Sequence, residues 1–154
     1  MMYHEEKLNL FSIDDSYYIA HCISADFALG AGIAKEIDKR FNTRAKLFDK
    51  FPNGFEYYLD ENSTNGECIL IDRVLNLVTK RKYYDKPTYK SMDQALTMMR
   101  EVCIYSNITK VAMPTIGCGL DRLSWNRVRD IIINKFSATD NIEILVCIII
   151  TKTL

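Results

Sequence analysis

Along the chain, short apolar runs typical of strands alternate with segments whose apolar residues recur at helical spacing, which predicts alternating strands and helices. Short apolar or β-rich runs of strand length occupy residues 17–21, 68–71, 74–78, 110–113 and 142–150. Apolar side chains at helical spacing lie over residues 33–41, over 89–105, and from Ser124 to about Phe136. Strands separated by helices need crossover connections, so we expect an α/β fold with helices on both faces of a mixed, mainly parallel sheet.

Local signals refine these elements. Ser91 followed by Gln94 resembles a capping box near the start of the helix over 89–105, and Ser124 is placed to cap the last helix. The unbroken apolar run over 142–150 predicts a final strand that is buried on both faces. Gly54 and Gly66 stand in ordinary turn contexts.

Length and composition indicate one globular domain. The chain has 154 residues, within the usual range for a single core, so we expect one domain over 1–154. A hydrophobic fraction of 48% excludes a disordered or fibrous chain. Twenty Lys and Arg balance twenty Asp and Glu. The zero net charge argues against a protein that wraps a polyanion, but it permits a small pocket for one anionic ligand.

Cysteine and histidine usage predicts neither disulfides nor a metal site. The five cysteines are odd in number and form no C-x-x-C pair, so we expect free, mostly buried thiols. The two histidines are too few for a metal cluster, and we expect no metal and no cofactor. No signal peptide and no apolar run of ~20 residues is present, which predicts an intracellular, cytoplasmic protein without a membrane partner. Without a long heptad repeat, we expect a monomer.

Candidate ligand-binding residues follow the predicted strands, because parallel sheets bind ligands beyond the carboxyl ends of their strands. The segments concerned are 24–32, 80–86 and 114–121. The first holds Gly30-Ala-Gly32 and the last holds Gly117-Cys-Gly119, each just before a helix. Glycines let backbone N–H groups approach a phosphate, and helix starts add free donors. Two such loops suit the two halves of a diphosphate; the alternative is a pair of turns that need positive φ.

Lys80 and Asp121 are the candidate catalytic residues. Lys80 ends an apolar strand, where a lysine is usually a solvated edge charge. If it is held at a pocket wall instead, its amine can attack an aldehyde-like carbon, such as C1 of an opened ribose. Asp121 can supply the matching base, or it caps the helix that follows. Cys22 and Cys118 would need a nearby base to act as nucleophiles.

Five segments of the chain resemble the macrodomain family, and within it the terminal ADP-ribose protein glycohydrolase subgroup. They are His21-Cys-Ile-Ser24, Gly30-Ala-Gly-Ile-Ala34, Leu77-Val-Thr-Lys80, Lys86-Pro-Thr-Tyr89 and Met113-Pro-Thr-Ile-Gly-Cys-Gly-Leu-Asp-Arg-Leu123 with Trp125. The resemblance runs from about residue 8 to 149 and implies a three-layer α/β/α macrodomain. It implies an enzyme that binds ADP-ribose and cleaves its ester linkage to protein Glu or Asp side chains. Related members also act on O-acetyl-ADP-ribose and on ADP-ribosylated nucleic acid bases.

The resemblance also assigns roles to single residues. Lys80 looks like the lysine that attacks the anomeric carbon, and Asp121 looks like its acid/base partner. The residues expected to contact ADP-ribose are Asn9, Leu10, Ser24, Gly30, Ala31, Gly32, Ile33, Pro114, Thr115, Ile116, Gly117, Cys118, Gly119 and Leu120. The alternative is a non-catalytic module that reads ADP-ribose or ADP-ribosylated protein; a module facing nucleic acid is disfavoured by the zero net charge.

Asn9 and the segment over residues 55–73 depart from the macrodomain pattern, and we carry no role over to that segment. Asn9 stands where the family usually has an aspartate that accepts a hydrogen bond from the adenine amino group. An amide oxygen can accept the same bond, but the amide also presents donors, so we expect weaker adenine binding. The usual distal-ribose asparagine is missing, and residues 24–26 take that stretch, as in the subgroup.

Overall fold

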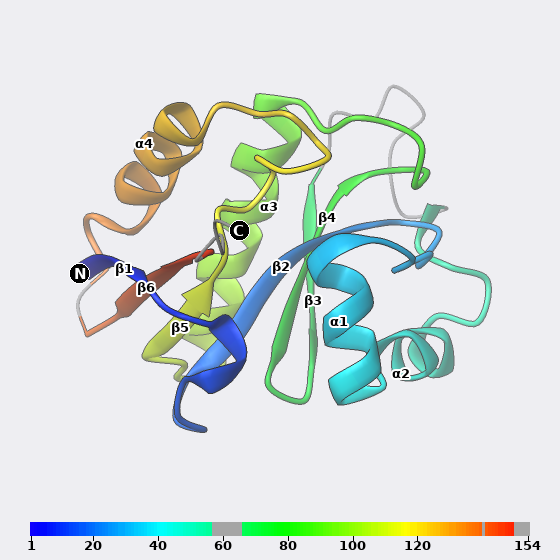
Figure 1. Ribbon diagram of the computed structural model, residues 1–154, viewed down its shortest axis with the longest axis horizontal. Coiled ribbons are helices and arrows are strands. Elements are labelled where there is room, and N and C mark those ends of the chain that lie inside the picture. Colours follow the sequence, from blue (N-terminus) through cyan, green and yellow to red (C-terminus); the bar gives the residue numbers. More distant parts are fainter. Residues whose placement is uncertain (57–65, 140, 150–154) are drawn as a thin grey trace, which may run out of the picture.

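A computed structural model describes residues 1–56, 66–139 and 141–149. Six strands form one sheet in the order β1-β6-β5-β2-β4-β3 (Figure 1). The strands are β1 (Met2–Lys7), β2 (Tyr18–Ser24), β3 (Glu67–Ile71), β4 (Val74–Lys80), β5 (Lys110–Met113) and β6 (Glu143–Ile148). The helices are α1 (Gly32–Phe41), α2 (Thr43–Lys50), α3 (Tyr89–Tyr105) and α4 (Trp125–Phe136), with a 3₁₀ turn, η1, over Leu10–Ser12.

The sheet is mixed and mainly parallel, as predicted. Every neighbouring pair is parallel except β3 and β4, which form an antiparallel hairpin around Asp72 and Arg73. Helices α1 and α2 cover one face of the sheet, and α3 and α4 cover the other (Figure 1). This is the three-layer α/β/α arrangement. Because five strands run the same way, their carboxyl ends share one edge of the sheet, where the candidate residues follow them.

The core lies on both faces of the sheet. The predicted inner face of α3 is confirmed, since Met92, Leu96 and Met99 have no exposed area and Cys103 is 2% exposed. On the opposite face, Ile37 of α1 is fully buried against the sheet. The final strand β6 is buried over its middle residues, as its apolar run predicts, although it ends at Ile148, and residue 150 lies outside the described part.

Two elements escape the sequence pattern for a physical reason. Strand β1 is an edge strand whose side chains are mostly exposed and include His4, Glu5, Glu6 and Lys7, so it has no apolar run. Charged side chains on an edge strand discourage pairing with other chains. Helix α2 is only eight residues long and buries little besides Leu47, which leaves its helical period weak.

The start of α3 differs from the predicted cap. Thr88, not Ser91, is the N-cap residue: its hydroxyl accepts from Ser91 N at 3.0 Å, and Ser91 Oγ accepts from Thr88 N at 3.0 Å. Gln94 accepts instead from Gly66 N at 3.0 Å. A Cβ on Gly66 would lie 2.1 Å from Ser91 O, so this glycine allows the chain to press against α3 and is not in an ordinary turn. Ser124 occupies the N-cap position of α4 but makes no side-chain capping bond.

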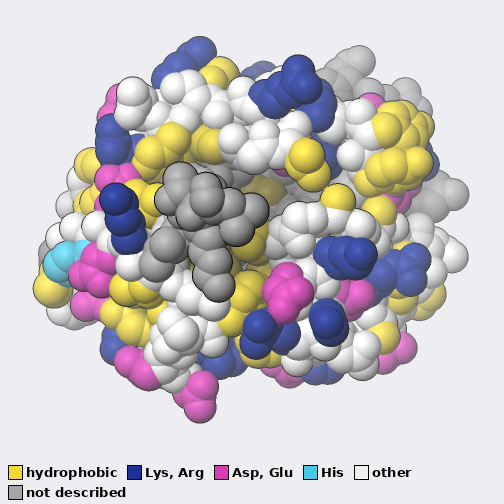
Figure 2. Space-filling model, viewed as in Figure 1, with side chains coloured by type: hydrophobic (Ala, Val, Ile, Leu, Met, Phe, Trp, Pro, Cys, Tyr) yellow, Lys and Arg dark blue, Asp and Glu magenta, His cyan; other side chains and the backbone are white. Residues whose placement is uncertain are grey.

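Charges are mixed on the surface. On the face shown in Figure 2, basic and acidic side chains are interspersed, so no large region of one sign covers it. Among the described residues, no helix combines the length and the apolar character needed to cross a bilayer.

Candidate active site

A largely buried ion pair joins the two predicted catalytic residues. Lys80 is the last residue of β4, and Asp121 lies in the turn between β5 and α4. Lys80 Nζ is 2.7 Å from Asp121 Oδ1, and the two side chains are only 15% and 16% exposed. Solvent and salt screen such a pair less than an ion pair on the open surface. The fold therefore places an amine and a carboxylate in direct contact at the carboxyl edge of the sheet.

A β-bulge lies directly beside Lys80. Along the parallel pair of β2 and β4, Ile23 stands opposite Val78, but the next residue, Ser24, stands opposite Lys80. Thr79 is thus an extra residue that has no partner on β2. Since successive side chains of a strand alternate between faces, one extra residue changes the face to which the following side chain points. The bulge therefore sets the face of the sheet toward which the Lys80 side chain points.

Asp26 ties the loop after β2 to the loop after β4. Its carboxylate accepts from Ala28 N at 3.2 Å and from Tyr83 N at 3.0 Å, and it also accepts from the Ser24 hydroxyl. The backbone adds two bonds between the same loops, from Ala25 N to the Lys80 carbonyl at 2.9 Å and from Asp26 N to the Arg81 carbonyl at 3.2 Å. These bonds hold the first glycine loop in register with the strand end that carries the lysine.

The first glycine loop has an unusual backbone. Phe27 and Leu29 have left-handed φ values of 55° and 42°, which residues with a Cβ rarely adopt. Their side chains are anchored in the core, with 0% and 6% of their areas exposed, and burial of this kind can hold a strained backbone. Arg44 Nε also donates to the Phe27 carbonyl at 2.9 Å. The loop is thereby fixed before it reaches the exposed residues at positions 30–32.

Helix α1 begins at this loop without a side-chain cap. Its N-cap residue is Ala31, which offers no polar side chain to the first backbone N–H groups. Free N–H groups and the partial positive charge of a helix start favour an anion. Gly32 has a φ of 58°, and a Cβ there would meet nothing within 4 Å. No atom of the residues that the structure describes therefore fills the space that a side chain at position 32 would occupy, beside the start of this helix.

The second glycine loop turns sharply at Gly117. Its φ is 75°, and a Cβ there would lie 2.7 Å from Met92 Cε and 3.0 Å from Leu123 Cδ1. Leu123 N donates back to the Gly117 carbonyl at 2.8 Å, which closes the turn. Gly119 differs, since a Cβ there would meet nothing within 4 Å. Gly117 is thus needed for the shape of the loop, while Gly119 faces open space.

Two residues after β4 hold the second loop in place. Lys86 Nζ donates to the Leu120 carbonyl at 2.7 Å. Tyr89, the first residue of α3, accepts from Ser124 N through its hydroxyl at 2.9 Å. These bonds fix the segment on both sides of Asp121, so the carboxylate is positioned by contacts outside its own loop.

The predicted contact residues divide by exposure. The side chains of Leu10, Ser24, Pro114 and Ile116 are buried, so only their backbone groups can face a ligand. Ile33, Thr115, Gly117 and Cys118 are partly exposed, and Asn9, Gly30, Ala31, Gly32, Gly119 and Leu120 are exposed. Asn9 caps the η1 turn, and its Oδ1 already accepts from Phe11 N at 2.9 Å. This bond takes one of the two lone pairs that an adenine amino group would use.

The cysteines and His21 act as core residues. Burial raises the pKa of the Cys22 thiol, and the nearby Asp121 carboxylate adds to this rise. Burial also raises the pKa of the Cys118 thiol, so neither side chain is an activated thiolate. His21 Nε2 lies 2.6 Å from Asn76 Oδ1, and burial lowers the pKa of His21 to about 4. The described residues hold no metal-ligating cluster.

The positioning residues are those that sequence reasoning misses most. Asp26 and the bulge at Thr79 have no motif of their own. Asp26 lies just after a strand, where polar side chains of parallel sheets gather, and in the stretch 24–26 that the resemblance singles out, but its bonds to the loop after β4 follow only from the fold. Lys86 belongs to the segment that resembles the family, but its bond to Leu120 follows only from the fold.

No model of a known protein family matches the chain. Human ADP-ribose glycohydrolase OARD1 is 36% identical over 138 residues, which cover 87% of this chain and 84% of the human protein, and the cattle protein of the same name matches equally well. Among solved structures, the macrodomain of Thermus aquaticus DarG superposes with a TM-score of 0.76 at 16% identity, over 95% of this chain and 97% of that one. The macrodomain of Mycobacterium tuberculosis DarG also superposes with a TM-score of 0.76, at 18% identity, over 98% of this chain and 99% of that one.

Thermosipho africanus DarTG in complex with ADP-ribose superposes with a TM-score of 0.66 at 16% identity, over 94% of this chain and 40% of that one. The structural neighbours share the fold, and the human and cattle proteins share the sequence over most of their length. The chain belongs to the macrodomain family, in its ADP-ribose glycohydrolase group.

Proposed function

We propose that this ADP-ribose glycohydrolase cleaves the ester between ADP-ribose and a Glu or Asp side chain of a modified protein, with Lys80 as nucleophile and Asp121 as acid/base. The observation that carries the proposal is the 2.7 Å contact between Lys80 Nζ and Asp121 Oδ1 at the edge where both glycine loops lie. A module that only reads ADP-ribose needs neither an amine nor a base beside its ligand.

Backbone groups of the two glycine loops suit the diphosphate of ADP-ribose. The first loop ends at the uncapped start of α1, and the second ends before α4, whose N-cap Ser124 likewise makes no side-chain capping bond. Both loops thus offer N–H donors and helix-start charge to an anion. The fold shared with DarTG, which was solved with ADP-ribose, supports the same ligand for this chain.

The proposed reaction uses the ion pair to form a covalent intermediate on Lys80 and then to hydrolyse it. Asp121 first accepts a proton from Lys80, which frees the amine. Lys80 Nζ then bonds to C1 of the terminal ribose as the C1–oxygen bond of the ester breaks, and the protein carboxylate leaves with the electron pair.

The ribose ring next opens: the bond from C1 to the ring oxygen breaks, Asp121 moves a proton from the nitrogen to that oxygen, and a protonated imine forms between Nζ and C1. Water adds to C1 and the C1–nitrogen bond breaks, so that both protons of the water end on the amine and C1 becomes an aldehyde. The ring oxygen then closes back on C1, and Asp121 releases its proton to solvent. ADP-ribose and the unmodified carboxylate are the products.

Release of ADP-ribose from a glutamate-ADP-ribosylated protein tests the proposal. We expect wild type to release it, and Lys80→Ala and Asp121→Ala each to lose at least about a hundredfold of the rate, since each removes a group that takes part in the chemistry. Lys46→Ala is the matched control, because Lys46 pairs with Asp72 at the opposite end of β4. Wild type that binds ADP-ribose but releases none would establish the reader alternative.

A further inference from the structure

The two edges of the sheet differ in their protection. Edge strand β1 carries four charged or titratable side chains in a row, over residues 4–7. Edge strand β3 begins with Glu67 and continues as Cys68-Ile-Leu-Ile71 without a charge or a proline. Natural edge strands usually carry charges or prolines that prevent pairing with another chain. The β3 edge lacks this protection.

Strand β3 also directs backbone groups outward, away from β4. It pairs with β4 from Glu67 opposite Val78 to Ile71 opposite Val74, next to a two-residue turn. The pair beside such a turn exchanges both hydrogen bonds, and every second pair does the same. Cys68 and Leu70 therefore direct their N–H and C=O groups away from the sheet. Within the described part of the chain, Cys68 N donates to Glu67 Oε1 at 3.1 Å.

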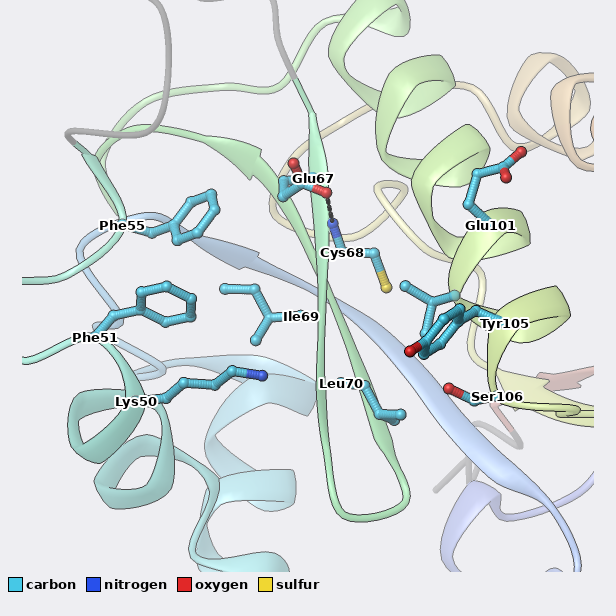
Figure 3. Close-up of a pocket in the computed structure, with 11 residues that line it drawn as sticks. Lys50, Phe51, Phe55, Glu67, Cys68, Ile69, Leu70, Glu101, Tyr105 and Ser106 are labelled. Atoms are coloured by element: carbon cyan, nitrogen blue, oxygen red, sulfur yellow. Dashed lines mark hydrogen bonds between the residues drawn. The ribbon is translucent and has the colours of Figure 1, made fainter.

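A cavity of about 540 Å³ surrounds this edge (Figure 3). Its walls are mostly apolar: Phe51 and the buried Phe55 line it on the α2 side of the strand, and Tyr105 of α3 lines it on the other side. Tyr105 is 91% exposed. A strand that joined this edge would therefore meet the exposed ring of Tyr105 on its α3 side.

Two charged residues at this edge, Glu67 and Lys50, are placed so that a second copy of the chain complements them. In Figure 3, Glu67 lies toward one end of β3 and Lys50 toward the other, both on the α2 side. On the α3 side, Glu101 lies toward the first end and Ser106 toward the second. A two-fold axis perpendicular to the sheet reverses the strand direction and keeps each face on its own side. It brings Lys50 of one copy toward Glu67 of the other, and Glu101 toward Ser106.

We propose that the β3 edge is a homodimer interface, in which two copies pair their β3 strands antiparallel about Ile69. Cys68 of each copy then stands opposite Leu70 of the other, and each such pair exchanges two backbone hydrogen bonds. In the dimer, the Glu67 carboxylate pairs with Lys50 of the second copy instead of accepting from Cys68 N. The Cys68 N–H can then donate to the backbone of the second copy. The absence of a heptad repeat predicts a monomer, but an edge strand that no described strand covers arises only from the fold, so the sequence pattern does not reveal it.

Sedimentation of the full chain over a wide concentration range tests the interface. We expect wild type to form a dimer, and Lys50→Glu and Glu67→Lys each to sediment as a monomer, because each change places like charges opposite one another. An equimolar mixture of the two variants should regain the dimer, since each supplies the partner that the other lacks. Lys39→Glu, an equal charge change at an exposed position of α1, should remain dimeric.

A backbone variant tests the strand pairing itself. Leu70→Pro removes an outward N–H that β4 does not use, so we expect a folded monomer with unchanged ADP-ribose release. A wild type that stays monomeric at every concentration would overturn the proposal, as would charge variants that remain dimeric or a mixture that fails to associate. A monomeric wild type that binds an extended peptide at this edge would also overturn it, in favour of a different partner.

Discussion

Replacing Gly117 with alanine should cost the protein a measurable part of its stability. The φ of 75° disfavours any residue with a Cβ, by about 1–2 kcal/mol. The added methyl group would also lie 2.7 Å from Met92 Cε and 3.0 Å from Leu123 Cδ1. The Met92 methyl group can move partly aside, so we assign the overlap about 1–2 kcal/mol. The expected loss in free energy of unfolding is about 2–4 kcal/mol.

Gly119→Ala is the matched control two residues away. A Cβ at Gly119 meets nothing within 4 Å, and its φ is not positive. A glycine-to-alanine change at such a position stabilises by up to about 1 kcal/mol, because it restricts the unfolded chain. If the loop backbone contacts the diphosphate, the added methyl group should instead weaken ADP-ribose binding. One variant thus reports on the shape of the loop and the other on its ligand.

Urea unfolding and calorimetry measure the difference. We expect Gly117→Ala to lower the melting temperature by on the order of 10 °C, and Gly119→Ala to leave it unchanged or slightly raised. Equal stability of Gly117→Ala and wild type would refute the reasoning, because it would mean that neither the left-handed backbone nor the contact with Leu123 constrains this turn.

Three further predictions follow from single contacts. Burial lowers the pKa of His21 to about 4, so between pH ~6.5 and 4 the unfolded chain binds more protons than the folded one. About 3 kcal/mol of the free energy of unfolding should therefore be lost as pH falls through that range. In urea titrations at several pH values, His21→Gln should not show this loss. Asp26→Asn should raise KM for ADP-ribosylated protein more than the surface change Asp49→Asn, because it weakens the bonds between two loops. Lys86→Ala should raise KM a few-fold with a smaller change in melting temperature, since its bond to Leu120 is exposed; an unchanged KM would show that the brace is unnecessary.

Periodicity predicts the elements whose apolar residues are buried in a regular pattern. Helix α3 shows this best, because its inward residues recur over a long segment and face one side of the sheet. The pattern fails for β1, which lies at an edge and carries charges, and for α2, which buries little. The predicted capping box is three residues too late. Serine is common at the N-cap, the first position of such a box, but Ser91 occupies its last position, N3, and Thr88 is the N-cap.

The position of the site follows from topology, but its geometry does not. Once strands alternate with helices, Lys80 and Asp121 are expected at the same sheet edge. Their 2.7 Å contact depends on the bulge at Thr79 and on the bonds that Lys86 and Tyr89 make to the second loop. A bulge adds one residue to a strand and requires no particular residue type here, so a single sequence carries no signal for it.

Chemical trapping of the proposed intermediate tests the central claim most directly. Wild type is mixed with a glutamate-ADP-ribosylated protein, treated with a borohydride reductant, digested and analysed by mass spectrometry. We predict an ADP-ribose-derived adduct on the peptide that contains Lys80, and no adduct in Lys80→Ala. Full hydrolysis by wild type without any adduct at Lys80, or hydrolysis by Lys80→Ala at the wild-type rate, would contradict the account.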